Sequence, residues 1–227
     1  MFDHSEVSKI REEQNAQFTA PKKPYQTLMQ SISNVFHPLL VLTVTAIVIC
    51  IFTPMSIYPL QVKLFFVGEV FFYSLFMPAL SITLMHVFHL VGHWALRDRR
   101  DRALPFLVNF ICYSMNLYAL HHTGFIPQWV LSIYWASVIL TFIAWIVSFW
   151  WKISAHASAD AAGATAFLIL HYWFPLTMPL WLGLAAVIIV GFVCTTRLYL
   201  GRHTLAQVAA GSLLGICTML FATTVFS

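Results

Sequence analysis

The chain has 227 residues, of which 60% are hydrophobic and 9% are charged, and its formal net charge is +4. Soluble domains carry roughly 25% charged residues, so this deficit, together with several apolar runs of about 20 residues, indicates a polytopic membrane protein. The composition also argues against a nucleic-acid partner, because basic residues and stacking aromatic residues do not interleave on a soluble face.

The N-terminal segment 1–35 is polar and of mixed charge, with no apolar stretch close enough to Met1 for a secretory signal. We expect it to be a flexible or surface-lying tail, and 36–227 to form one transmembrane domain. Seven apolar segments follow, each long enough to cross a hydrocarbon core about 30 Å thick. They run over 37–54, 62–92, 105–121, 127–151, 157–174, 177–199 and 204–226. The predicted fold is therefore an all-α membrane bundle of six to seven transmembrane helices.

With seven spans, the N-terminus and the connections after the second, fourth and sixth spans lie on the same side of the membrane. The tail and these three connections hold all the basic residues except Lys63. The positive-inside rule then predicts that this side is cytoplasmic. We expect an integral multi-pass protein of a bacterial inner membrane, although loop arginines that serve chemistry are weak markers of topology.

The three connections on that side carry most of the polar functional groups. Their sequences are RDRRDRALP over 97–105, KISAH over 152–156 and TRLYLGRHTLAQ over 196–207. Guanidinium and ammonium groups with few carboxylates are typical of a site for a dense anion, and phosphate is the obvious candidate. The residues that we expect to bind phosphate are Arg97, Arg102, Lys152, Ser154 and Arg197.

Two histidines in these connections, His156 and His203, allow a nucleophile and a general acid to be separate groups. His203 stands at an expected helix start, just after Gly201. A helix N-terminus favours an anion and keeps a nearby imidazole neutral and nucleophilic. His156 alone would carry little weight, but the third connection has an arginine, five residues, a histidine and a polar acceptor four residues further on, which is a demanding pattern.

The third connection resembles the third motif of the type 2 phosphatidic-acid phosphatase superfamily, which also includes vanadium haloperoxidases. That motif has Ser-Arg, five residues, His, three residues and Asp. Here Thr196 stands for the serine, Arg197 for the arginine and His203 for the nucleophilic histidine. KISAH is similar to the second motif, Pro-Ser-Gly-His, with Ser154 and His156 matching.

The first motif of that family, Lys, six residues and Arg-Pro, is matched only in part. Arg97 falls at the lysine position and Pro105 at the proline, but Leu104 replaces the arginine. Arg102 is a candidate to replace the missing arginine if the loop turns it inward. The resemblance covers roughly residues 60–226, with its three motifs in the family's order and on one side.

The resemblance implies a phosphohydrolase that acts on a lipid phosphate or diphosphate without a metal or other cofactor. His203 would attack phosphorus and form a phosphohistidine, and His156 would protonate the leaving group. Arg197, Arg97 and Ser154 would hold the phosphoryl oxygens. Water would then release inorganic phosphate.

The sequence departs from the family at Gln207, which stands where the family has an aspartate. One helical turn separates Gln207 from His203, so the two side chains can meet. A glutamine carbonyl can accept the imidazole N–H and set the tautomer, but it cannot stabilise an imidazolium as a carboxylate does. Asp160 follows His156 by one turn inside an apolar span, where a carboxylate is costly. We expect it to pair with His156, or alternatively with a loop arginine.

Other functions stay open at this stage. The same phosphohistidine would serve a lipid phosphotransferase, and the same anion site would serve a non-catalytic protein that binds or transports a lipid phosphate. A haem or metal site on His86, His89 and His93 is a more distant alternative, and we interpret these residues as interfacial. Glu69, deep in the second span, either contacts another span or marks a cavity.

Overall fold

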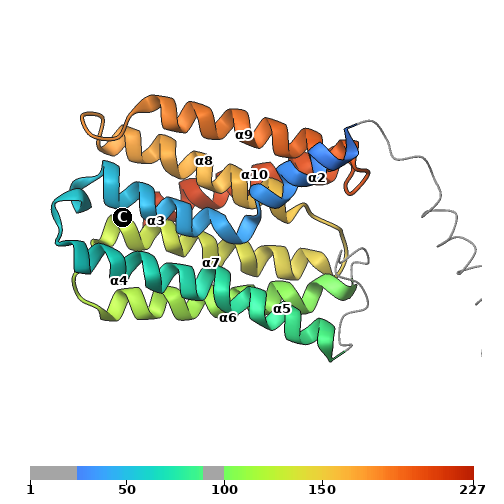
Figure 1. Cartoon of the computed structure of the whole chain (residues 1–227), viewed down its shortest axis with the longest axis horizontal. Helices are drawn as coiled ribbons and strands as arrows, with labels where there is room; N and C mark the ends of the chain where they lie inside the picture. Colours follow the sequence, from blue (N-terminus) through green and yellow to red (C-terminus); the bar gives the residue numbers. More distant parts are fainter. Residues whose placement is uncertain (1–24, 89–99) are drawn as a thin grey trace, which may run out of the picture.

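The structure is a computed structural model that describes residues 25–88 and 100–227, the latter with side chains from Ala103 onward. Every regular element in these residues is a helix, and the helices run alongside one another as a bundle (Figure 1). The α-helices are α2 Gln26–Val35, α3 Val41–Phe52, α4 Leu60–Phe71, α5 Met77–Val87, α6 Arg100–His122, α7 Gln128–Ser148, α8 Ala155–Trp173, α9 Leu180–Tyr199 and α10 Leu205–Val225. Helix α2 continues through η1 into α3, and α4 continues through η3 into α5. The described α-helices therefore form seven long helical rods.

Short irregular helices join some of these elements. A 3-10 helix, η1 Pro38–Leu40, links α2 to α3, and a second, η2 Pro54–Ile57, follows α3. A π-helical turn, η3 Phe72–Phe76, joins α4 to α5 without interrupting the rod. Proline stands at the first position of η1 and of η2, where its missing N–H costs no helical hydrogen bond.

Six of the seven rods are long and apolar enough to cross a membrane, and α8 is the exception. The first turns of α8 consist largely of Ala, Ser and Gly with one Asp, and most of its residues are buried against α9, α10 and α3. Conversely, only 17% of the most apolar window of Leu60–Val87, and of Leu180–Tyr199, is buried inside the bundle. Apolar faces that are so exposed suit a bilayer environment. The predicted all-α polytopic bundle is therefore confirmed.

Close packing of α8 against α10 depends on two glycines in the GSLLG stretch. A Cβ atom on Gly211 would lie 2.8 Å from the carbonyl oxygen of Ser154, and one on Gly215 would overlap the carbonyl oxygen of Ser158. Both obstacles are backbone atoms, which cannot rotate away. These glycines therefore let the two helices approach closely.

Ten residues of the segment predicted to be a flexible or surface-lying tail form α2. These residues form a helix that packs against α9, and Thr196 donates from Oγ1 to the sulfur of Met29 at 3.5 Å. Only residues 1–24 of the predicted tail lie outside the described residues. The polar face of α2 therefore belongs to the folded bundle.

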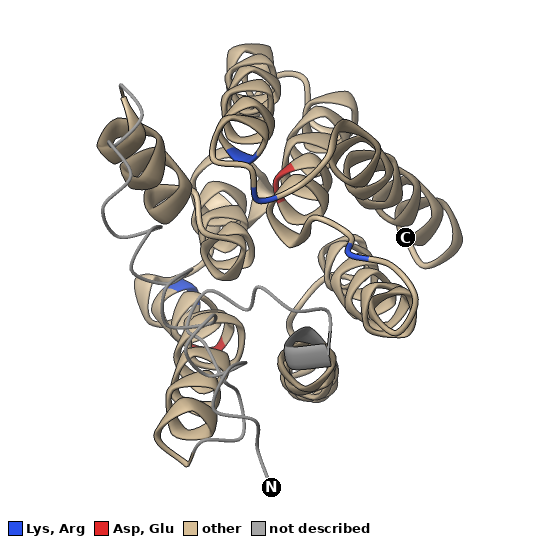
Figure 2. Ribbon diagram, turned by 90° about the vertical axis from the view of Figure 1, so that its right-hand side faces the viewer, with Lys and Arg blue, Asp and Glu red and all other residues tan. Residues whose placement is uncertain are grey.

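The connections that carry the second and third motifs lie at the same end of the bundle as α2 and the start of α6, at the right of Figure 1, and the C-terminus lies at the other end. Figure 2 looks onto this end and shows how few Lys, Arg, Asp and Glu residues the described helices carry. The topology expected from seven spans therefore brings these connections together.

Candidate functional site

The turn between α9 and α10 positions two of the predicted site residues, Arg197 and His203, and adds Arg202. Gly201 has φ 64°, a left-handed conformation that glycine adopts without a steric penalty. Its N–H donates to the carbonyl oxygen of Leu198 and the N–H of Arg202 donates to that of Arg197, both at 3.0 Å. This is a Schellman motif, which ends a helix and reverses the chain at once. It leaves Arg197, Arg202 and His203 close together at the end of the bundle.

The start of α10 fixes the imidazole of His203. Thr204 and Gln207 form a capping box in which the Gln207 Oε1 atom accepts the Thr204 N–H at 3.2 Å. The same oxygen lies 3.2 Å from Nδ1 of His203. Because an amide oxygen can only accept, this contact assigns a proton to Nδ1 and leaves Nε2 with a lone pair. Gln207 thus caps the helix and orients the histidine with one atom.

The start of α8 separates the predicted residues of the second motif. Ser154 is the N-cap, its Oγ atom accepts the N–H of Ala157 at 3.4 Å, and its side chain is fully buried. It does not line the pocket described below, and neither does Lys152, which is half-buried. His156, in the first turn, does line that pocket. The structure therefore gives Ser154 a capping position rather than the predicted position against phosphate.

Helix α2 supplies residues that sequence reasoning missed. Arg197 donates from Nη1 to Oγ of Ser33 at 2.9 Å, and the same oxygen lies 3.5 Å from Nε2 of His156. The ring of His37 meets that of His156 edge-on, with the centroids 5.5 Å apart. Ser33, which is 2% exposed, therefore links the second motif to the third. The available signal was the helical spacing of Gln30, Ser33, Asn34 and His37 in the tail.

These groups surround one pocket at the end of the bundle, with a volume of about 420 Å³. Its lining includes His156, His203 and Arg197 of the predicted set, together with Ser33, His37 and Arg202, which were not predicted. Pro105 also lines it, so the end of the first predicted motif reaches the same place. The described lining contains no Asp or Glu, and the pocket therefore suits an anion.

The electrostatics of the pocket bear on His156. Burial and the Arg197 guanidinium hold the pKa of His156 well below its usual range, and His37 and His203 act in the same direction. This lowered pKa favours the neutral imidazole. A bound phosphate would offset the arginine charge and favour the protonated form, which a general acid needs.

Asp160 does not join this cluster, and two other predicted residues cannot be placed because they lie outside the described side chains. Asp160 is 8% exposed, its Oδ2 atom has no hydrogen-bond partner, and it does not line the pocket. Neither the predicted bond to His156 nor an ion pair with an arginine forms among the described side chains, because His156 faces Ser33 and His37 instead. Arg97 and the side chain of Arg102 lie outside the described residues, as do His89 and His93.

The fold and the pocket together define a polytopic all-α membrane protein with a cationic, histidine-bearing site at one end of its bundle. No protein-family model, curated protein or solved structure matches the chain. The functional conclusion below therefore depends on the geometry of the site and on the motifs in the sequence.

Proposed function

We propose that the protein is a membrane phosphohydrolase that removes phosphate from a lipid phosphate or diphosphate through a phosphohistidine on His203. One observation carries the proposal. His203, whose Nδ1 atom is held by Gln207, shares a pocket with His156 and Arg197. The hydroxyl of Ser33 connects His156 to Arg197. The resemblance of the two connections to phosphatase motifs supports the same chemistry.

The first step forms one bond and breaks another at phosphorus. The Nε2 lone pair of His203 attacks, the P–O bond to the lipid breaks, and protonated His156 gives its proton to the departing oxygen. Arg197 stabilises the charge that builds on the equatorial oxygens. The products are the phosphorylated histidine and a lipid alcohol, or a lipid monophosphate if the substrate is a diphosphate.

The second step returns the enzyme to its starting state. His156, now neutral, accepts a proton from a water molecule as that water attacks phosphorus. The P–N bond breaks, its electron pair returns to Nε2 of His203, and inorganic phosphate leaves. This step reverses the proton transfer of the first, so no group outside the pocket is needed.

The surroundings of the pocket support an amphiphilic substrate. The pocket opens at one end of a bundle whose outer faces are apolar, so a molecule with both a phosphate headgroup and an apolar chain suits this place. The candidates are polyprenyl diphosphate, phosphatidic acid, phosphatidylglycerol phosphate and lipid A phosphate. From the pattern of basic residues we place the site at the cytoplasmic face of a bacterial inner membrane.

Phosphate release from the purified protein tests the proposal. We expect release from at least one lipid monophosphate or diphosphate in a panel, and loss of that release in His203→Ala. Transfer of the phosphate to an added alcohol in preference to water would make the protein a phosphotransferase. No release from any member of the panel would leave a binding or transport protein and contradict the proposal.

A further inference from the structure

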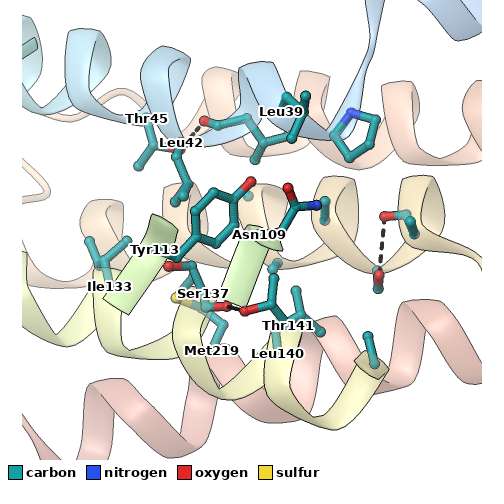
Figure 3. A pocket seen from close by; sticks show the side chains of 18 of the residues that line it. Leu39, Leu42, Thr45, Asn109, Tyr113, Ile133, Ser137, Leu140, Thr141 and Met219 are labelled. Atoms are coloured by element: carbon teal, nitrogen blue, oxygen red, sulfur yellow. Dashed lines mark hydrogen bonds between the residues drawn. The ribbon is translucent and has the colours of Figure 1, made fainter. Parts of the chain in front are cut away.

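A second cavity lies deeper in the bundle, enclosed by η1, α3, α6, α7 and α8 (Figure 3). Its volume is about 70 Å³. Leu39, Phe106 and Asn109 line both this cavity and the phosphate pocket. The two spaces are therefore neighbours that share a wall or a neck at these residues.

The lining of the deeper cavity is apolar. Figure 3 shows Leu42, Ile133, Leu140 and Met219 around it, on helices far apart in the sequence. Side chains of this kind gain nothing from contact with water, and an apolar cavity of this size stays dry unless a hydrocarbon fills it. Burying hydrocarbon there is favourable in proportion to the apolar area covered.

Most hydroxyl groups in the lining donate within their own helices, and that of Tyr113, labelled in Figure 3, is the exception among the described residues. Thr45, Ser137 and Thr141 all face the cavity, but each donates its hydroxyl to a carbonyl of its own helix, at 2.8, 2.7 and 2.8 Å. With these donors engaged, the cavity presents mainly their carbon atoms. The walls therefore suit an alkyl or isoprenoid chain rather than a polar ligand.

The junction of the two spaces contains a buried polar atom that lacks a hydrogen bond. Oδ1 of Asn109 is buried and has no hydrogen-bond partner among the described residues. A buried amide oxygen without a partner is unfavourable, because it has lost its hydrogen bonds to water. Because Asn109 lines both spaces, a ligand that passes from one to the other would bring its linking group past this amide.

We propose that the apolar chain of the lipid phosphate enters this cavity, and that the side-chain amide N–H of Asn109 donates to the ester oxygen that joins the chain to its phosphate. The inference rests on the proposed function for the phosphate itself. The cavity holds about five water-sized groups, since each needs ~10–15 Å³. It therefore takes the carbons nearest the phosphate, and the rest of a long chain lies outside it.

Two matched substitutions test this placement through substrate selectivity. Thr45→Leu adds bulk inside the cavity, whereas Thr195→Leu makes the same change on the exposed face of α9, and both hydroxyls bond a carbonyl of their own helix at 2.8 Å. The measurement is the ratio of kcat/KM for dodecyl phosphate to that for ethyl phosphate. We expect Thr45→Leu to lower the ratio about tenfold and Thr195→Leu to leave it unchanged. An unchanged ratio in folded Thr45→Leu would overturn the inference.

A labelling experiment gives an answer that does not depend on turnover or on the folding of a variant. The probe is dodecyl phosphonate with a diazirine on its fourth carbon, applied to wild type and to His203→Ala in detergent micelles. We expect the label on cavity residues of α3, α6 or α7. Label confined to the exposed faces of α4 and α9 would overturn the inference. Label in the cavity without any phosphate release would uphold it and contradict only the proposed hydrolysis.

Discussion

At the scale of single residues, the site depends on polar atoms that serve two neighbours at once. The Gln207 amide oxygen caps α10 and meets Nδ1 of His203, and the Ser33 hydroxyl accepts from Arg197 and meets His156. Each shared atom fixes the relative position of two groups that the proposed reaction needs. Removing either should therefore affect turnover more than stability.

Ser33→Ala should lower kcat/KM about tenfold or more, because a hydrogen bond to a charged group contributes about 1.5–3 kcal/mol. Steady-state kinetics with the best lipid phosphate measure this loss, and Ser33→Thr should restore part of it. Ser31→Ala is the matched control, since the Ser31 hydroxyl is on the same helix but bonds only the carbonyl of Thr27. Equal activity in Ser33→Ala and Ser31→Ala would exclude Ser33 as a positioning residue.

Gln207→Glu should raise kcat. Glutamate keeps the length and the capping box, and its carboxylate stabilises the cationic ring of phosphorylated His203 better than an amide does. Stopped-flow and steady-state measurements of phosphate release test this increase. Thr204→Ala is the control, because it removes a capping bond at a cost of about 1 kcal/mol and should lower Tm with little change in kcat. A lower kcat in Gln207→Glu would mean that the ring needs a neutral acceptor.

At the scale of whole elements, the position of the site is set by how α2, α8 and α10 pack. Helix α2 brings Ser33 to the pocket through its contacts with α9, and His37 reaches the pocket from the N-cap of η1, just after α2. The glycines of α10 let that helix approach α8 until backbones touch, which holds His156 and His203 at a fixed distance from each other. The interface between α8 and α10 therefore supports both stability and geometry.

Gly215→Ala should destabilise the protein by about 1–3 kcal/mol, because the added methyl group meets the Ser158 carbonyl oxygen and the helices must move apart. Thermal unfolding in detergent measures the change as a lower Tm. Gly191→Ala is the control on α9, where a Cβ atom would meet nothing within 4 Å, and alanine should leave Tm unchanged or raise it. If both variants melt alike, the interface is looser than the packing indicates.

The elements also show what the sequence can and cannot predict. The apolar runs predicted the long rods, and the four-residue spacing predicted that Gln207 can reach His203. Helix α2 was missed because its residues are mostly polar and its stability comes from packing against α9, 160 or so positions away in the chain. The bond from Arg197 to Ser33 could not be predicted for the same reason, since no local sequence pattern encodes a contact between positions so far apart.

At the scale of the whole molecule, the number of spans determines which connections meet. Seven rods place the second and third motifs at one end, as the sequence predicted, and leave the C-terminus at the other (Figure 1). Asp160 illustrates the limit of that reasoning, because one-turn spacing from His156 was not enough to make the pair. The bundle turned His156 toward α2 instead.

The central claim is that His203 carries phosphate during turnover, and trapping that intermediate tests it most directly. Wild type and His203→Ala are mixed with a lipid phosphate that bears a radiolabelled phosphoryl group, quenched in base within the first turnover, and mapped by mass spectrometry. We expect an acid-labile, base-stable label on His203 in wild type and none in His203→Ala. Phosphate release from wild type without a labelled histidine, or unchanged turnover in His203→Ala, would contradict it.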